Sequence, residues 1–273
     1  MLGKYLENVR TTAPLIHNIT NYVTVNDCAN ILLACGASPI MADDPDEAAD
    51  ITAICGGLVI NIGTLNKNTI PSMFAAGRQA NALKHPVILD PVGAGASPLR
   101  TNTAKKLLEE IQFTVIRGNI SEIKALALGS GGARGVDADV ADAITEETLD
   151  STIEFAKHFS KKTGAIIVIT GVIDIVTDAD NVYVIRNGHP LMSRITGSGC
   201  MLTCLIGAYI AANPDDCSGA TAAAVCAMGL CGERAAARLA DSEGNSTYRN
   251  YLIDEIFRLD SKLLDAGANS ENR

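Results

Sequence analysis

The chain has 273 residues, 47% of them hydrophobic, and is therefore long enough to bury a substantial core. Its formal net charge at pH 7 is −9, and no run of lysine or arginine occurs. Because nucleic acids and anionic membranes repel an acidic protein, the charge argues against both as partners and favours a small-molecule ligand.

The beginning of the chain, MLGKYLENVRTTAPLIHN, lacks the apolar core of a secretory signal, so we expect a cytoplasmic protein. Two later apolar runs, at residues 200–212 and 220–232, are shorter than the ~18 to 20 residues that a membrane span needs. They predict buried helices instead. The eight cysteines show no metal-ligand spacing, and without a secretory signal we expect free thiols.

Short segments rich in β-branched residues recur along the chain and end in turn residues. They predict strands at residues 38–42, 57–63, 86–93, 113–119, 165–171 and 181–188. Helical patterns separate most of these strands, at residues 21–36, 67–84, 100–111, 120–129 and 146–164. This alternation is typical of βαβ units, and the continuous apolar strands suit a sheet covered on both faces. The sequence therefore predicts one α/β domain over residues 1–273, with a mainly parallel central sheet.

After residue 193 the pattern changes to helices rich in alanine, glycine and cysteine. Small side chains of this kind let helices approach each other and the sheet closely. The final segment, DAGANSENR at residues 265–273, is polar, and we expect it to fray.

Ligands bind beyond the carboxyl ends of the strands in an open parallel sheet, so the strand ends are where a site is expected. Four of the five ends that we consider carry polar or glycine residues. In chain order the ends are Met41, residues 61–64, residues 90–95, residues 117–119 and residues 170–171.

Asp90 follows a buried strand and precedes a proline and a Gly-x-Gly turn. It is either a local turn or cap residue, or a carboxylate that projects toward a metal ion or a polarised substrate. A charge at a buried strand end needs a partner to offset its desolvation, and this favours the second interpretation.

Arg117 and Glu122 lie in the segment RGNISE, on either side of an expected helix start. Asn119 or Ser121 could be a simple N-cap, with Glu122 favourable in the first helical turn. Alternatively, Arg117 neutralises a phosphate while Glu122 holds a water of a bound metal.

The turn from Thr196 to Cys200, TGSGC, precedes an apolar helix. Small residues at this position expose backbone N–H groups at the positive end of the helix dipole, which is a natural anion site. The turn lacks the spacing of a Walker loop or of a dinucleotide fingerprint. A glycine turn with a purely structural role is the alternative.

Cys200 is expected to be the first residue of this helix, where the dipole lowers the pKa of a thiol. A buried packing role is the alternative for Cys200, and it is the interpretation that we favour for Cys204, Cys226 and Cys231. His17 and His189 are expected in polar turns, which leaves a Cys–His nucleophilic pair open.

Taken together, these motifs resemble those of the hydroxyethylthiazole kinase family, in the ribokinase-like superfamily. The resemblance runs from about residue 15 to about residue 239. The motifs that carry it are PLIHNITNYVTVNDCANILLACGASPIMA, GLVINIGTL, VILDPVGAGASPLRT, VIRGNISEI, GVDA, VITG, NGHPLM and TGSGCML.

The resemblance implies a ribokinase-like three-layer sandwich that transfers the γ-phosphate of ATP to the primary alcohol of 4-methyl-5-(2-hydroxyethyl)thiazole. It also implies homotrimers with active sites between subunits. The roles that it implies are thiazole contacts for Met41 and Gly197, ATP binding for Arg117 and Thr170, Mg²⁺ organisation for Asp90 and Glu122, and the catalytic base for Cys200. Most ribokinase-like kinases have an aspartate at this last position.

Two other functions remain open from the sequence. One is another ribokinase-like activity, such as hydroxymethylpyrimidine phosphorylation or repair of hydrated nicotinamide nucleotides. The other is a non-catalytic module that binds the thiazole.

Overall fold

A nine-stranded sheet forms the centre of the computed structural model, which describes residues 1–128 and 144–273. Its strand order is β2-β1-β3-β4-β5-β6-β7-β8-β9. In chain order the strands are β1 (Leu15–Ile19), β2 (Ser38–Ile40), β3 (Gly57–Asn61), β4 (Val87–Asp90), β5 (Val115–Asn119), β6 (Ile166–Thr170), β7 (Asp174–Thr177), β8 (Val182–Ile185) and β9 (Ser270–Asn272).

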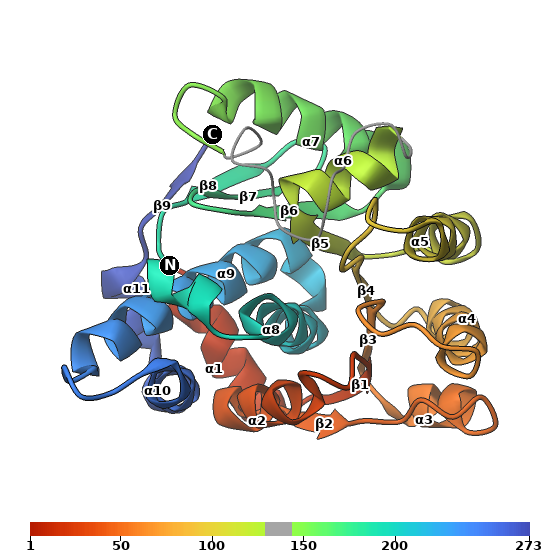
Figure 1. The fold of residues 1–273 in the computed structure, drawn as a ribbon, viewed down its shortest axis with the longest axis horizontal. Helices are drawn as coiled ribbons and strands as arrows, with labels where there is room; N and C mark the ends of the chain where they lie inside the picture. Colours follow the sequence, from red (N-terminus) through yellow and green to blue (C-terminus); the bar gives the residue numbers. More distant parts are fainter. Residues whose placement is uncertain (129–143) are drawn as a thin grey trace.

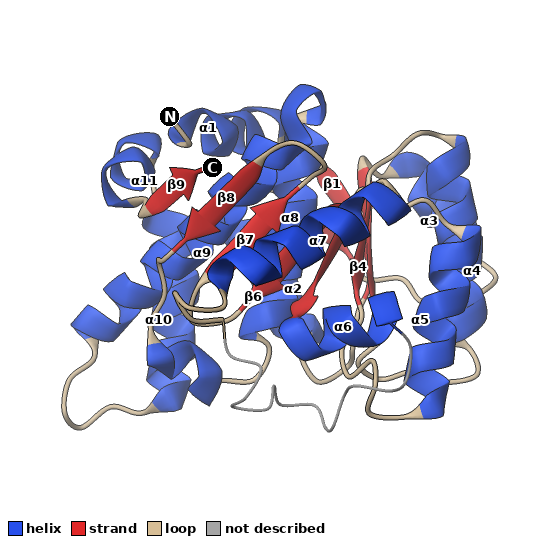
Figure 2. Cartoon of the chain, turned by 90° about the horizontal axis from the view of Figure 1, so that it is seen from above, coloured by secondary structure: helices blue, strands red, loops and turns tan. Residues whose placement is uncertain are grey.

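The strands from β2 to β6 in this order pair in parallel, whereas β7, β8 and β9 are antiparallel additions at one edge (Figure 2). The prediction of a mainly parallel α/β sheet is therefore confirmed. All six predicted strands are present, each shorter than its predicted range. They are β2, β3, β4, β5, β6 and β8.

Helices cover both faces of the sheet (Figure 1). One face carries α3 (Ala48–Ile54), α4 (Thr69–Ala82), α5 (Pro98–Glu110), α6 (Ile120–Leu128) and α7 (Leu149–Thr163). The other face carries α1 (Gly3–Thr12), α2 (Val25–Cys35), α8 (Ser198–Ala212), α9 (Cys217–Arg238), α10 (Asn245–Arg258) and α11 (Ser261–Gly267). None of the helices in the described ranges is long and apolar enough to cross a membrane.

Successive side chains of β3 point into two different apolar cores, which explains why residues 58–60 of the strand are all apolar. Leu58 and Ile60 pack into the core beneath the α3–α7 face, whereas Val59 packs into the core beneath α8 and α9. Gly207 allows α8 to approach the sheet closely, because a Cβ there would lie 3.0 Å from Val59 Cγ2. Both faces are therefore buried, as the apolar strands predicted.

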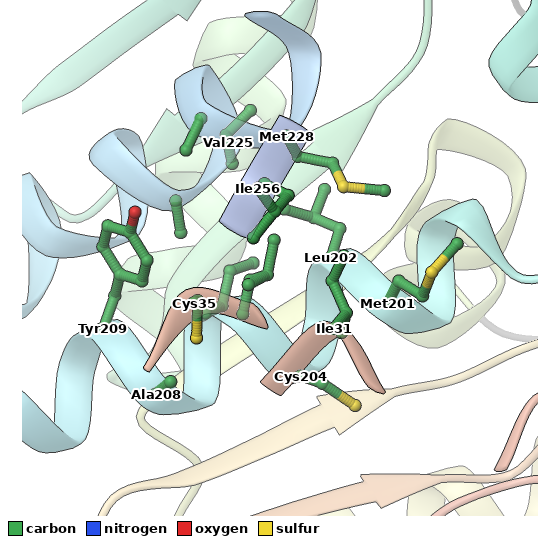
Figure 3. Close-up of a cluster of buried hydrophobic side chains, with 14 of the residues drawn as sticks. Ile31, Cys35, Met201, Leu202, Cys204, Ala208, Tyr209, Val225, Met228 and Ile256 are labelled. Carbon is green, nitrogen blue, oxygen red and sulfur yellow. The ribbon is translucent and has the colours of Figure 1, made fainter. Parts of the chain in front are cut away.

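Figure 3 shows the core on the α8 side, where side chains from α2, α8, α9 and α10 meet. Tyr209 is buried against this cluster, and so are Cys204, Cys226 and Cys231. The packing interpretation of these three cysteines is confirmed. All eight cysteines of the chain are free thiols.

Three strands differ from the expectations. β1 and β7 were not predicted, and the expectation that the chain end frays is wrong. There β9 pairs with β8, and the Arg273 amide donates to Val182 O over 2.9 Å. Backbone pairing to a strand edge therefore orders a segment whose polar side chains gave no strand signal. The GVDA motif at residues 135–138 lies outside the described residues.

Candidate active site

The register of the parallel strands brings the predicted polar residues together where the strands end, at the carboxyl-end edge of the sheet. Asn61 at the end of β3 pairs with Asp90 at the end of β4, and Asn119 of β5 pairs with Thr170 of β6. The amino-terminal end of α8 meets this edge, because Thr203 reaches Asp90 there. The strand ends and α8 together form the candidate site.

Asp90 is completely buried at the centre of this edge. Its Oδ2 accepts hydrogen bonds from Asn61 Nδ2 and from Thr203 Oγ1, both over 2.8 Å. Among the described residues no donor forms a hydrogen bond with Oδ1, although Arg117 Nη1 lies 3.6 Å from it. Burial raises the pKa of Asp90, and the charge of Arg117 opposes that rise. The hydrogen bonds of the Asp90 carboxylate thus run to distant parts of the chain and not to the local turn, which argues against the interpretation as a local turn residue.

Arg117 joins β5, β6 and the start of α8. Its Nη2 donates to Thr170 Oγ1 over 2.6 Å, and its Nη1 faces Asp90. The guanidinium packs directly on Gly199, where an added Cβ would lie 2.5 Å from Nη1. Glycine is needed at this position because the arginine occupies the space that a side chain would fill.

The α8 amino terminus lies beside this guanidinium. Its first backbone bond runs from Met201 N to Gly197 O, so the N–H groups of Ser198, Gly199 and Cys200 precede the helical ladder. Gly197 adopts φ +87, and a Cβ there would lie 2.5 Å from Thr24 Cγ2. A cation and a helix amino terminus thus converge on one point, an arrangement that suits a phosphate.

Cys200 is the third residue of α8, and the expectation that it is the first is wrong, because the helix begins at Ser198. Asn21 Nδ2 donates to its sulfur over 3.1 Å and Asn61 Nδ2 donates over 3.3 Å. A second hydrogen bond, to the Oδ1 atom of each asparagine, fixes which end of the side-chain amide faces the sulfur. Asn21 Oδ1 accepts from Thr24 N, and Asn61 Oδ1 accepts from Gly63 N.

The expectation of a lowered thiol pKa is not met. Burial, followed by the nearby charge of Asp90, raises the pKa of Cys200 to about 11, and Arg117 opposes this only in part. Desolvation of the thiolate therefore outweighs the helix dipole at this position. The thiol is mostly protonated at neutral pH.

The two histidines considered as partners of Cys200 are engaged elsewhere. His17 lies in β1, not in a polar turn, and its ring nitrogens contact Thr52 Oγ1 and Ala42 O. His189 Nδ1 accepts from Leu191 N at the start of a short 3₁₀ helix. The structure therefore gives no support to a Cys–His pair.

Glu122 takes part in the helix cap that the sequence left open. Its Oε2 accepts from Asn119 N while Asn119 Oδ1 accepts from Glu122 N, which is a reciprocal cap at the start of α6. Its Oε1 accepts from Gly93 N in the loop after β4, over 2.8 Å. Burial and the charge of Asp90 raise the pKa of Glu122, so the two carboxylates lie close enough to interact.

The residues fit magnesium better than an all-protein metal cage. Within the described ranges no group of three or more His, Cys, Asp and Glu side chains could hold an ion. Magnesium is usually held by one or two carboxylates together with phosphates and water. Asp90 supplies an oxygen without a hydrogen bond, and Glu122 lies within electrostatic range.

Met41 directly follows the edge strand β2, and its half-buried side chain packs against the core beneath α8. Among the described residues, no hydrogen bond links the Met41 side chain to the Asp90 network.

Sequence reasoning missed Arg100, whose guanidinium donates to Val92 O and Gly63 O, both over 2.7 Å. It thereby ties the loop after β3 to the loop after β4. It also missed Asn21, Thr24 and Thr203, and gave Asn61 no role. Only the position of Asn61 at a strand end could have singled it out.

Comparisons with known proteins identify similar sequences and structures. The sequence model of the hydroxyethylthiazole kinase family matches residues 6–262. A protein from Clostridium acetobutylicum named hydroxyethylthiazole kinase is 67% identical over 272 residues, covering 100% of both chains. The solved structure of a hydroxyethylthiazole kinase protein from Pyrococcus horikoshii OT3 is 32% identical, with a TM-score of 0.88 over 100% of this chain and 98% of that one.

A ribokinase-like superfamily protein from Enterococcus faecalis V583 is 14% identical, with a TM-score of 0.61, over 93% of this chain and 89% of that chain. This second structure shows the shared fold alone. The expected ribokinase-like sandwich is confirmed.

Proposed function

Because this chain belongs to the hydroxyethylthiazole kinase family, we propose that it phosphorylates the primary alcohol of 4-methyl-5-(2-hydroxyethyl)thiazole with ATP and Mg²⁺. It is an enzyme of the kinase class. The 67% identity over the whole chain supports the substrate assignment. The observation that carries the proposal is the convergence of Arg117, the α8 amino terminus and Asp90 at one edge of the sheet.

Charge stabilisation accounts for most of the proposed catalysis. Phosphoryl transfer passes through a loose transition state, with negative charge spread over the transferring oxygens. The guanidinium of Arg117 and the free amides at the start of α8 would offset this charge. Thr170 holds Arg117 in place through its 2.6 Å hydrogen bond, which supports a role for both in ATP binding.

Asp90 and Glu122 are the residues that would hold magnesium or its water. The ion, when bound with ATP, supplies positive charge next to the phosphate oxygens. Asn61 and Thr203 keep the Asp90 carboxylate oriented, and Gly93 and Asn119 do the same for Glu122.

Cys200 is proposed to accept the proton of the substrate alcohol, with Met41 and Gly197 contacting the thiazole. Cys200 must be a thiolate to accept this proton, and burial leaves only a small thiolate fraction at neutral pH. A loose transition state limits this cost, because it needs little proton transfer early. Two side-chain amides aimed at the sulfur would stabilise the negative charge of the thiolate before it takes the proton.

We further propose that residues 1–273 form a single kinase domain that acts in the cytoplasm as a homotrimer with shared sites. The family match over residues 6–262 supports the single domain. Exposed apolar side chains beside the site support a partner surface, since Tyr22 is 76% and Val23 58% exposed in the loop that carries Asn21.

The proposal is tested by a coupled ADP-release assay with the thiazole alcohol and Mg²⁺. A panel of other alcohols, including hydroxymethylpyrimidine, and hydrated nicotinamide nucleotide serve as comparison substrates. Turnover that is highest with the thiazole alcohol supports the assignment. Binding of thiazole and ATP without ADP formation would identify a non-catalytic module, and faster turnover of another substrate would identify a different kinase.

A further inference from the structure

His17 is a buried histidine with no place in the proposed phosphoryl transfer. It is completely buried in the middle of β1, between Ile40 of β2 and Leu58 of β3. Its neighbours Ile16 and Asn18 point to the α8 side of the sheet, where Ile16 belongs to the core and Asn18 contacts Cys204. By the alternation of a strand, His17 points to the opposite side, toward α3.

Both ring nitrogens of His17 have a partner. Nε2 lies 2.7 Å from Ala42 O, and a carbonyl oxygen only accepts, so Nε2 carries a proton. Nδ1 lies 2.8 Å from Thr52 Oγ1 on α3. Burial lowers the pKa of His17, which favours a neutral ring with the proton on Nε2. The imidazole thus acts as a fixed link between β1, α3 and the segment after β2.

The segment after β2 depends on this link. β2 has three residues and lies at the edge of the sheet, so its backbone pairs with β1 alone. Ala42 immediately follows Met41. Beyond it, Ser72 Oγ on α4 donates to Asp43 O over 2.7 Å. Of these two side-chain bonds to the backbone of this segment, the His17 bond is the nearer to Met41, and it holds the carbonyl of the next residue.

We infer that His17 is a positioning residue for the thiazole side of the site, acting through Ala42 to fix the backbone that presents Met41. This inference rests on the proposed function, in which Met41 contacts the thiazole. It predicts an effect on thiazole affinity that is separate from ATP affinity, because the ATP side is held by Arg117 and Thr170 on β5 and β6.

Two conservative variants separate the two ring nitrogens. In His17→Gln the side-chain amide reaches the position of Nε2 and keeps a donor for Ala42 O, whereas in His17→Asn the amide reaches only the position of Nδ1. Thr52→Val is the matched control, because it removes the partner of Nδ1 and leaves the bond to Ala42 intact. Steady-state KM values for thiazole alcohol and for ATP, together with kcat, are measured for the wild type and all three variants.

We expect His17→Asn to raise KM for the thiazole alcohol by about tenfold, the size typical of a buried carbonyl that loses its donor. In His17→Asn the KM for ATP should stay within about twofold of the wild-type value. In His17→Gln and in Thr52→Val, the KM values for both substrates should stay within about twofold of the wild-type values. Equal rises in both KM values, an unchanged thiazole KM in His17→Asn, or a tenfold rise in Thr52→Val would each overturn the inference.

If His17→Asn does not fold, the other two variants decide, since both must keep the thiazole KM of the wild type. Wild-type protein that does not phosphorylate the thiazole alcohol refutes the proposed function instead. In that case calorimetric titration with the thiazole alcohol tests His17 directly. Weaker binding in His17→Asn alone supports its role, and equal binding or no binding in all forms refutes it.

Discussion

Asn61 on β3 lies opposite Asp90 on β4, and its side-chain amide donates both to Asp90 Oδ2 and to the sulfur of Cys200. One amide group thus connects the proposed metal-binding carboxylate with the proposed base. The distances are 2.8 Å and 3.3 Å, and Asn61 Oδ1 is held by Gly63 N over 2.9 Å. The relative position of the two reactive groups therefore depends on this side chain.

Asn61→Ala is expected to lower kcat by about 10- to 100-fold, because a buried carboxylate and a thiol both lose a donor. KM for ATP should change less than kcat. Kinetics with thiazole alcohol and ATP measure both parameters, and Asn30→Ala, at an exposed position on α2, serves as control. A kcat equal to that of the wild type would remove Asn61 from the site.

How far the sequence predicts this fold depends on where each polar group finds its partner. Apolar strands such as GLVIN and IIVIT carry their own signal and were predicted. β1 was missed because His17 and Asn18 interrupt its apolar pattern. Their partners, Thr52, Ala42 and Cys204, lie 25 to 186 residues away in the chain.

The residues of the candidate site likewise fall into those that the sequence could predict and those that it could not. Positions at the ends of apolar strands made Asp90, Arg117 and Thr170 candidates, and the structure brings these strand ends together. Asn21 and Thr203 gave no signal, since their roles come only from contacts across the fold. The pKa of Cys200 could not be predicted either, because burial depends on the surrounding helices and not on the local helix end.

Arg117→Ala should weaken the use of ATP more than the binding of thiazole. A charge-assisted contact to phosphate contributes about 1.5 to 3 kcal/mol, which corresponds to a rise in KM for ATP of about 10- to 150-fold. Arg78→Ala is the matched control, since its pair with Glu110 is exposed and contributes little. Equal loss of affinity for both substrates in Arg117→Ala would contradict the assignment to ATP.

Asp90→Asn and Glu122→Gln keep the size of each side chain and remove its charge. If these carboxylates act through magnesium, each variant should need about tenfold more Mg²⁺ for half-maximal turnover. Magnesium titrations at saturating ATP and thiazole measure this. Asp150→Asn, in an exposed ion pair with Arg273, is the control and should titrate like the wild type. Wild-type magnesium dependence in both site variants would leave the two carboxylates a structural role only.

The oligomer is tested by its mass in solution. Light scattering is expected to give a species of three times the 28.5 kDa chain mass. Val23→Asp places a charge on the exposed apolar rim of the site and should reduce both the trimer fraction and kcat. Phe257→Asp, at another exposed apolar position on α10, should change neither. An active wild-type monomer would be incompatible with shared sites.

The role of Cys200 is decided by how the reaction rate depends on pH. A base acts in its deprotonated form, and with a pKa of about 11 only about one thiol in ten thousand is ionised at pH 7. The thiolate fraction rises about tenfold for each pH unit below that pKa. If Cys200 is the base, wild-type kcat should therefore rise between pH 7 and pH 9 with a slope approaching one on logarithmic axes.

Cys200→Asp provides the comparison, because a carboxylate with a reference pKa of about 3.9 has its ionisation well below this range. It should keep or increase activity at pH 7 and show a flat profile from pH 7 to pH 9. Cys200→Ala should lose turnover while both KM values stay nearly unchanged. Since in-line transfer to the alcohol needs no covalent intermediate, mass spectrometry during turnover should find an unmodified Cys200. A flat wild-type profile would show that the sulfur only positions the alcohol, and a phosphorylated Cys200 would identify it as a nucleophile.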